Sequence, residues 1–223
     1  MYKKETFRDL DKKYNSHLYT GVLGILMNYC HKKLEIFKKK DSYDKVLEIG
    51  AGSAPHLKYL THSYNEYHIA ETSNYASEVF EKNLNNKIIF KKYDGKKLPY
   101  ENEYFDRIII SHCLEHILSP EEFMFEMMSK LKKGGVLSIS LPTDPGFAWR
   151  IGRMFIRLFS IKKTYNISGD EYEYINATEH INSIFNLISL IRYNFKDSIE
   201  ERFYPLKIKS PDLNLFYNVQ IYK

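Results

Sequence analysis

The sequence predicts an α/β fold in which a mostly parallel sheet of seven strands carries helices on both faces. Short apolar runs alternate with longer segments whose apolar residues recur at helical spacing, and the first of these runs ends in a glycine-rich turn. This alternation favours parallel strands joined by helical crossovers, because a parallel pair cannot be closed by a short hairpin. We therefore expect one sheet that is covered on both sides.

The size and composition of the chain fit a single globular domain with a sizeable core. It has 223 residues, of which 43% are hydrophobic and 27% are charged. The net charge of +5 comes mostly from lysines scattered along the chain, so it does not predict a nucleic-acid partner. The N-terminus is too polar for a signal peptide, and Cys30 and Cys113 match no disulfide spacing. We therefore expect a cytoplasmic protein.

The segment Lys45–Leu57, KVLEIGAGSAPHL, is the stretch around which we expect the fold to be organised. It predicts a buried strand that includes Glu48, a tight turn at Gly50 and Gly52, and a helix that begins near Pro55 and runs to about 63. Such a turn can hold a pyrophosphate, but Pro55 stands where the third glycine of the dinucleotide fingerprint should be. It can also lie against a nucleoside with an amino-acid tail, or it can bind no ligand.

Two helices are expected before this segment, over 1–18 and 21–40, because apolar residues recur there at helical spacing. The second helix ends in three lysines, which suit a helix C-terminus. Tyr14 or Tyr19 would then be able to cover a ligand bound at the glycine turn. Plain packing of these tyrosines on the core is the alternative.

Acidic residues follow the next two predicted strands, over 67–70 and 87–93. Glu71 lies near the spacing of ~20 residues at which an acid at a strand end meets ribose hydroxyls. Asp94 can accept a hydrogen bond from an adenine amino group, and Gly95 lets the loop lie flat on the base. Surface positions and an ordinary Asp-Gly turn are the alternatives. The core continues with a helix over 74–84, a strand over 107–111, a helix over 120–131 and a strand over 136–141.

Five sequence features occur together between about Lys45 and Pro142: VLEIGAGS, the acid at Glu71, YDG, LPYENEYFDRIIISHCLEHI and LKKGGVLSISLP. Their order and spacing resemble those of class I S-adenosylmethionine-dependent methyltransferases of the small-molecule type. The resemblance implies a Rossmann-like sheet whose last strand is antiparallel, and S-adenosyl-L-methionine as the cofactor. The ligand contacts that it implies fall on Glu48, Gly50, Ala51, Gly52, Glu71, Asp94, Gly95 and His112.

Residues 142–180 are expected to bind the acceptor. A turn at Asp144 precedes a helix over 149–159 that places arginines on one stripe, and a loop over 161–177 follows. The substrate-binding candidates are Arg150, Arg153 and Tyr172, with Arg157 on the same stripe as the two arginines. A basic stripe beside an apolar face suits an anionic acceptor or peripheral contact with a membrane surface, and a cover helix with solvated arginines is the alternative.

Three short motifs in this region, Asp-Pro-Gly, Trp-Arg and Glu-His-Ile-Asn, resemble those of methyltransferases associated with bacterial surface-polysaccharide synthesis. This resemblance implies a sugar or glycoconjugate acceptor. A helix over 181–193 and strands over 199–209 and 213–222 complete the expected sheet.

An alcohol acceptor is weak at neutral pH, so a general base helps, and histidine is best matched to that role. The candidates are His116 and His180, with Asp144 and Tyr172 behind them. His112, Glu115 and His116 also read His-x-x-Glu-His, but the segment directly follows a strand, unlike the helical zinc motif of metalloproteases. Ubiquinone O-methyltransferases that use a divalent metal have Glu where His112 stands. We therefore expect no metal; a divalent cation, and methyl transfer that relies on proximity without a base, are the alternatives.

The sequence predicts a methyltransferase that uses S-adenosylmethionine to methylate a hydroxyl of a sugar, a glycoconjugate or another small acceptor. A cofactor-binding scaffold without catalysis and an NAD-dependent oxidoreductase are the alternatives, and the missing third glycine disfavours the second. We expect a single domain over 1–223 with N-terminal cover helices at 1–40, a cofactor-binding core at 45–141, a substrate-binding insertion at 142–180 and a C-terminal helix and strands at 181–223.

Overall fold

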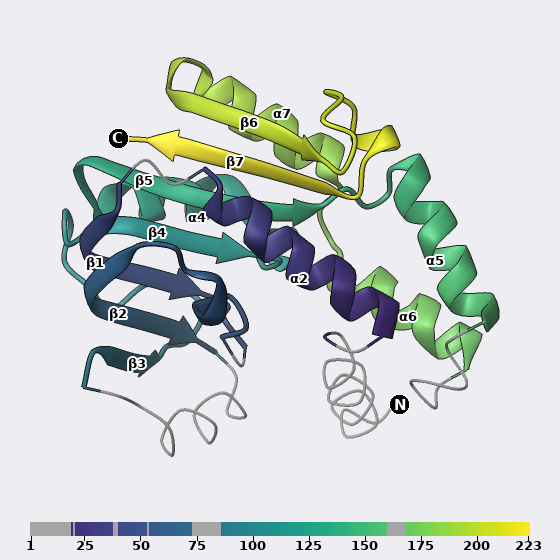
Figure 1. The fold of residues 1–223 in the computed structure, drawn as a ribbon, viewed down its shortest axis with the longest axis horizontal. Helices are drawn as coiled ribbons and strands as arrows, with labels where there is room; N and C mark the ends of the chain where they lie inside the picture. The colour runs from purple at the N-terminus through teal and green to yellow at the C-terminus, as the bar shows by residue number, and fades with distance from the viewer. Residues whose placement is uncertain (1–18, 20, 38–39, 53, 73–85, 160–167) are drawn as a thin grey trace.

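A twisted seven-stranded sheet forms the centre of the computed structural model, which describes residues 19, 21–37, 40–52, 54–72, 86–159 and 168–223 (Figure 1). The strands are β1 (Ser42–Ile49), β2 (Ser63–Glu71), β3 (Ile88–Lys92), β4 (Phe105–Ser111), β5 (Leu131–Pro142), β6 (Ile199–Tyr204) and β7 (Phe216–Tyr222). Their order is β3-β2-β1-β4-β5-β7-β6, and β7 runs antiparallel to both β5 and β6. The expected sheet, with its last strand antiparallel, is confirmed.

Helices cover both faces of this sheet. They are α2 (Gly21–Glu35), α4 (Pro120–Lys130), α5 (Phe147–Phe159), α6 (Gly169–Glu179) and α7 (Ile184–Asn194). Helix α2 crosses one face, α4 and α7 lie on the other, and α5 and α6 extend beyond the carboxyl ends of the strands (Figure 1). Within the described residues, no helix has the length and apolar character needed to cross a membrane.

The central strands are buried on both faces, which is why they read as continuous apolar runs. In β1, Leu47 and Ile49 pack into the larger core cluster, whereas Val46 packs into the cluster on the opposite face. In β4, Ile108 and Ile109 divide between the same two clusters. Successive side chains of a strand point to opposite faces, so one short run supplies both layers of the core.

Two expectations about local structure are wrong. No α-helix starts at Pro55, because Ala54 has a positive φ of 51° and only a 3₁₀ turn, Leu57–Tyr59, separates the glycine turn from β2. Residues 169–177 form most of α6 instead of a loop. The cap of that helix explains the difference, because the Ser168 side chain accepts from the Glu171 N–H while the Glu171 side chain binds the Ser168 N–H.

The other expected elements are present with shifted ends. Strands β1, β2 and β5 are longer than expected, β6 is shorter, and α2 ends before 40. The added residues of β2 are mostly exposed or half-buried, so they lack the apolar pattern that marks a buried strand. The helices expected over 1–18 and 74–84, the residue Tyr14, and residues 161–167 of the expected loop lie outside the described residues.

A buried ion pair joins α2 to the sheet. Arg107 of β4 places Nη1 at 2.8 Å from Glu35 Oε1, and both side chains are buried. Glu35 also contacts His56 Nε2 at 3.0 Å and accepts from the Thr61 N–H at 3.1 Å. One carboxylate therefore holds the end of α2 against β4 and against the segment that follows β1.

We expect Arg107→Met to lower the free energy of unfolding by about 3–5 kcal/mol, because Glu35 would stay buried without its cation. Urea denaturation followed by circular dichroism measures the change. Arg192→Met is the matched control, since it removes a partly exposed pair with Glu201 and should cost less than about 1 kcal/mol. Equal losses in the two variants would contradict a special role for the buried pair.

Candidate functional site

The turn after β1 requires glycine at two positions for two different reasons. Gly50 has a φ of +64°, and a Cβ there would collide with the Cys113 side chain. Gly52 has a φ of +53°, and, apart from its chain neighbours, no described residue has an atom within 4 Å of where its Cβ would stand. Gly50 thus permits close packing within the protein, whereas Gly52 presents bare backbone to open space.

Glu71, at the end of β2, fixes this turn. Its Oε2 accepts from the Gly52 N–H at 2.9 Å, and its Oε1 accepts from the Thr72 N–H at 2.7 Å. The Thr72 Oγ1 hydroxyl also donates to Oε1, at 3.3 Å, so this carboxylate ties the glycine turn to the end of β2. Glu71 and Thr72 also line the larger of the two cavities described below.

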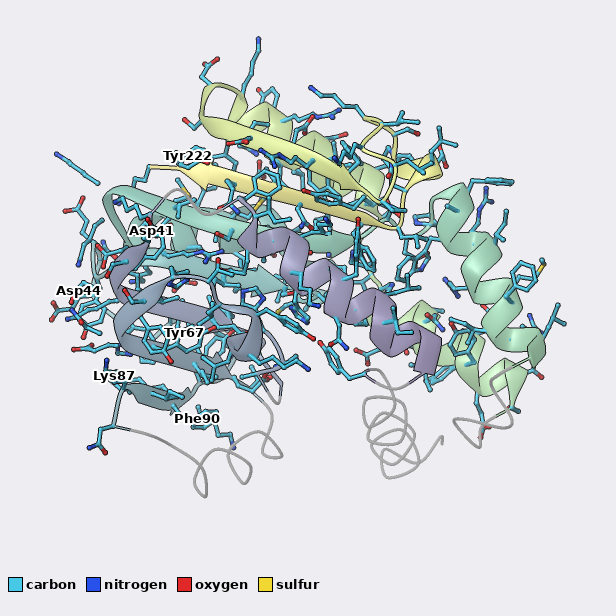
Figure 2. All side chains as sticks on the ribbon, in the orientation of Figure 1. Asp41, Asp44, Tyr67, Lys87, Phe90 and Tyr222 are labelled. Carbon is cyan, nitrogen blue, oxygen red and sulfur yellow. The ribbon has the colours of Figure 1, made fainter. Side chains whose placement is uncertain are left out.

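The smaller cavity, of about 130 Å³, lies against the glycine turn. Its lining residues are Tyr19, His31, Glu48, Gly50, Ala51, Gly52, Pro55, Ser111 and His112. Buried Glu48 accepts from the Oη of Tyr67 at 2.6 Å, and burial raises the pKa of the Glu48 carboxyl (Tyr67 is labelled in Figure 2). Tyr19 contacts His31 Nε2 through its Oη at 2.9 Å and thereby closes one side of the cavity.

The larger cavity, of about 410 Å³, has apolar walls, a polar end, and further polar lining residues that include Glu71, Thr72 and Arg153. Its walls include Leu26, Met27, Trp149, Ile156, Ile175 and Leu215. The polar end contains Glu115, His116 and His180. Gly50 and His112 line both cavities, so the two spaces meet there.

His112 sits at that junction in a constrained conformation. Its φ is +52°, its N–H donates to the Ser140 carbonyl at 2.9 Å, and its Nε2 lies 3.3 Å from Cys30 Sγ. Burial lowers the pKa of His112 to about 4, so the ring is neutral at physiological pH. A neutral ring at the junction places no positive charge beside the glycine turn.

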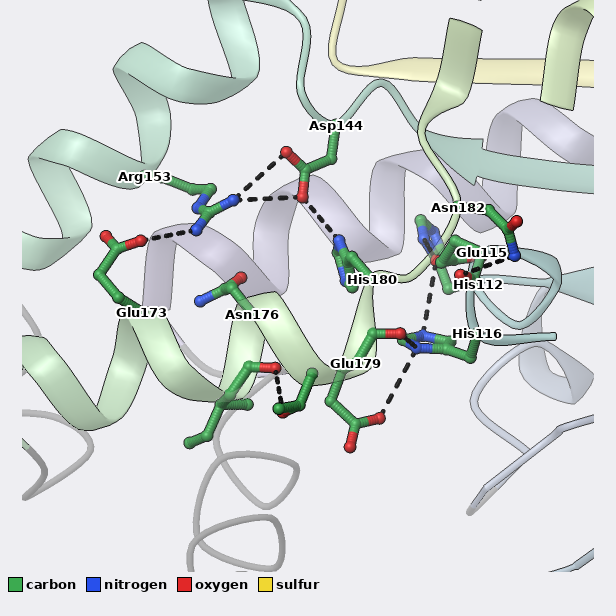
Figure 3. Close-up of polar contacts among 12 residues, drawn as sticks. His112, Glu115, His116, Asp144, Arg153, Glu173, Asn176, Glu179, His180 and Asn182 are labelled. Atoms are coloured by element: carbon green, nitrogen blue, oxygen red, sulfur yellow. Dashed lines mark hydrogen bonds and ion pairs between the residues drawn. The ribbon is translucent and has the colours of Figure 1, made fainter. Parts of the chain in front are cut away.

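The two histidines at the polar end are held through the same ring nitrogen (Figure 3). His116 Nδ1 lies 2.6 Å from the Glu179 carbonyl oxygen, and His180 Nδ1 lies 2.7 Å from Asp144 Oδ2. A carbonyl oxygen and a carboxylate only accept, so Nδ1 is the donor in both rings. The ring centroids are 5.2 Å apart.

Asp144 connects this end of the cavity to α5. Arg153 Nη1 lies 3.3 Å from each oxygen of Asp144, and its Nη2 contacts Glu173 at 2.9 Å. Burial raises the pKa of Asp144, but His180 and Arg153 outweigh it and hold the pKa below its usual range. Burial lowers the pKa of His180, and the hydrogen bond to Asp144 with the charge of Glu115 raises it above its ordinary value.

The structure brings together most of the site residues that the sequence predicts. Glu48, Gly50, Ala51, Gly52, Glu71 and His112 line the cavities, as do Arg153, Tyr172, His116 and His180. Asp94 is exposed and accepts from the Lys96 N–H at 2.9 Å, and neither Asp94 nor Gly95 lines these two cavities. Arg150 is exposed and does not line them either.

Sequence reasoning did not assign roles to His31, Ser111 or Glu115. Nothing near His31 in the sequence marks it, because α2 brings it to the cavity from a distant part of the chain. Glu115 was visible in the His-x-x-Glu-His spacing, but its neighbour at the polar end, His180, comes from the C-terminal end of α6. Only the tertiary structure shows that these groups meet.

Comparison with known proteins places residues 47–139 in a family model described as a methyltransferase domain. A sterol 24-C-methyltransferase of Schizosaccharomyces pombe is 29% identical over 104 residues, which are 43% of this chain and 27% of that protein. A demethylmenaquinone methyltransferase of Clavibacter sepedonicus is 26% identical over 141 residues, which are 60% of this chain and 58% of that protein. The chain therefore spans less than two thirds of the length of these curated relatives.

Solved structures share the fold. The plantazolicin methyltransferase in complex with S-adenosylhomocysteine superposes with a TM-score of 0.67 at 17% identity, over 100% of this chain and 92% of that one. This likeness agrees with the matched segment, which runs from β1 to β5 and contains the glycine turn and Glu71. Residues 47–139 thus match a methyltransferase-domain model, and the chain shares the fold of a methyltransferase solved with S-adenosylhomocysteine.

Proposed function

We propose that this protein transfers the methyl group of S-adenosylmethionine to an oxygen atom of a small acceptor bound in the larger cavity. The observation that carries the proposal is the junction at Gly50 and His112, where the cavity against the glycine turn meets the larger cavity, which His116 and His180 also line. A methyl donor in the first space and an acceptor in the second would face each other at this junction.

The residues around the glycine turn suit this cofactor. Bare backbone at Gly52 allows a ligand to approach closely, and the carboxylate of Glu71, at the end of β2, is of the residue type that accepts from the two hydroxyls of a ribose. Glu48 and Ala51 would face the amino-acid end of the ligand, while Asp94 and Gly95 stay as predicted adenine contacts. The cofactor supplies a methyl group on a positively charged sulfur, which is already activated for transfer.

The acceptor is the less defined partner. We assign acceptor binding to residues 142–180, because α5 and α6 contribute Trp149, Ile156, Tyr172 and Ile175 to the walls of the larger cavity. These walls favour an acceptor whose hydroxyl is attached to an apolar ring or chain. A glycoconjugate or another amphipathic small molecule fits this description better than a free sugar does.

The arginine stripe of α5 gives limited support to an anionic acceptor. Arg153 is paired with Asp144 and Glu173, and Arg157 lies 3.6 Å from Glu173 and 3.7 Å from Asp170. Two of the three predicted cations are thus close to carboxylates of the protein itself. Arg150 is exposed. It is therefore the arginine of the stripe that we propose as the contact for an anionic group of the acceptor.

Activation of the acceptor oxygen is assigned to His116 and His180. Both rings donate through Nδ1, so Nε2 is the atom with a lone pair available toward the cavity that both residues line. A hydroxyl placed there would lose its proton as the new O–CH₃ bond forms and the C–S bond breaks. Asp144 would orient the ring of His180 and stabilise its positive charge.

The exposed side of α5 supports the proposal of peripheral membrane contact. Phe147, Ile151, Met154, Phe155 and Leu158 form an exposed apolar face, while Trp149, Gly152, Arg153 and Ile156 line the larger cavity from the other side of the helix. One helix would then touch the bilayer and the acceptor together.

Cys30 and Cys113 are free thiols, which supports the proposal of a reducing, cytoplasmic location.

Gly52→Ala should weaken S-adenosylhomocysteine binding at least about tenfold, because the new methyl group would occupy the space of the ligand. Calorimetric titration measures the affinity. Gly134→Ala is the matched control, since Gly134 also has a positive φ, of 73°, and open space around its Cβ position. If both variants bind as tightly as the parent protein, the ligand does not lie against the glycine turn.

His180→Gln should lower the rate of methyl transfer by about 10²–10⁴-fold while cofactor affinity is unchanged, because the ring acts on the acceptor. Release of S-adenosylhomocysteine is followed with a panel of glycolipids, nucleotide sugars and demethylmenaquinone. His68→Gln, a buried histidine of β2 paired with Glu66, should change the rate less than about twofold. Cofactor binding without turnover on any acceptor would support the non-catalytic scaffold.

Replacing Phe155 and Leu158 together by Ser should reduce binding to vesicles of phosphatidylethanolamine and phosphatidylglycerol at least about tenfold, since two exposed apolar side chains are lost. Co-sedimentation measures the bound fraction. The paired control replaces Phe125 and Tyr193, which are exposed on α4 and α7. An equal reduction in both double variants would assign the contact to another surface.

A further inference from the structure

We propose that Glu115, His116 and His180 bind a divalent transition-metal cation at the polar end of the larger cavity. The inference rests on the proposed function, because it states how this end of the cavity would hold the acceptor oxygen. One ligand atom from each of the three residues lies within 4.8 Å of the others. The segment after β4 supplies Glu115 and His116, and the residue that ends α6 supplies His180 (Figure 3).

The carboxylate of Glu115 is the first argument. Glu115 is only 3% exposed, and its Oε2 is buried without a hydrogen-bond partner among the described residues. Its Oε1 lies 3.8 Å from His116 Nε2 and 3.9 Å from His112 Nδ1, both beyond hydrogen-bond distance. A buried carboxylate is expected to be paired or to coordinate a cation, because the loss of its hydration is otherwise uncompensated.

The orientation of the two imidazole rings is the second argument. His116 donates through Nδ1 to the Glu179 carbonyl at 2.6 Å, and His180 donates through Nδ1 to Asp144 at 2.7 Å. Each ring therefore keeps its proton on Nδ1 and leaves the Nε2 lone pair for another partner. Histidines that bind metals have this arrangement, in which a carbonyl or a carboxylate orients the ring.

The ligand set indicates the class of cation. Two imidazoles and one carboxylate suit Mn²⁺, Fe²⁺, Co²⁺ or Zn²⁺ better than Mg²⁺ or Ca²⁺, which prefer oxygen ligands. All three residues line the larger cavity, so the remaining coordination positions would face the acceptor. A bound cation would lower the pKa of the acceptor hydroxyl, and the proton would leave to water as the methyl group is transferred.

This ligand set differs from the one considered in the sequence. The expectation of no metal rested on His112, which stands where a glutamate is found in metal-dependent ubiquinone O-methyltransferases. His112 is not a member of the spatial cluster, and its place is taken by His180 from α6. The expectation of no metal therefore depended on His112, which is not one of the three ligands proposed here.

The test is calorimetric titration of the full chain, without a polyhistidine tag, with Zn²⁺, together with the visible absorption of the Co²⁺ form. We expect one cation per chain, and Glu115→Gln should weaken binding more than about 100-fold. Asp144→Asn should weaken it about 10–100-fold, because it disturbs the ring of His180. Glu173→Gln is the matched control, since Glu173 also contacts Arg153 but not the cluster.

Circular dichroism and S-adenosylhomocysteine binding, measured on the same samples, establish that each variant is folded. Failure of the folded parent protein to bind Zn²⁺ or Co²⁺, or unchanged affinity in Glu115→Gln, would overturn the metal site. The proposed function would survive that result, with His180 as a general base. Normal metal binding without methylation of any acceptor would instead leave the metal site in place and overturn the proposed function.

Discussion

The buried carboxylate of Glu35 is the constraint on which the cavity at the glycine turn depends. It joins the end of α2, the segment after β1 through His56, and β4 through Arg107. Burial raises the pKa of Glu35, but His56 and Arg107 outweigh it and lower the pKa to about 2, so the group is ionised. Because His31 lies one turn before Glu35 on α2, the same anchor sets His31 against the glycine turn.

Strained backbone is concentrated at the carboxyl edge of the sheet, where the cavities lie. Gly50, Gly52, Ala54 and His112 all have positive φ there, and such a conformation costs about 1–3 kcal/mol for a residue with a side chain. The strain at His112 is supported by the Ser140 carbonyl and by the contact with Cys30. The rigid sheet thus holds an unfavourable local conformation at the point where the two cavities meet.

The sequence predicts the sheet, and the residues that line the cavity at the glycine turn, because both depend on local patterns. Continuous apolar runs mark strands buried on both faces, and Gly50, Gly52 and Glu71 follow them at short, regular distances. Helix α6 was missed because polar residues dominate it, although its cap at Ser168 and Glu171 could be read. The contacts of His180 with Asp144, and of His31 with His56, join distant segments and have no local signal.

The polar end of the larger cavity depends on how the Asp144 carboxylate is shared between Arg153 and His180. Asp144 accepts from Arg153 of α5 and from His180 at the end of α6, so the positions of both helices are coupled to the His180 ring, which lines the larger cavity. The guanidinium of Arg153 is paired with the carboxylates of Asp144 and Glu173. Its charge therefore serves contacts within the protein more than contacts with a ligand. Under the proposed function, selection among acceptors would then depend on the apolar walls and on Glu115, His116 and His180 at the polar end.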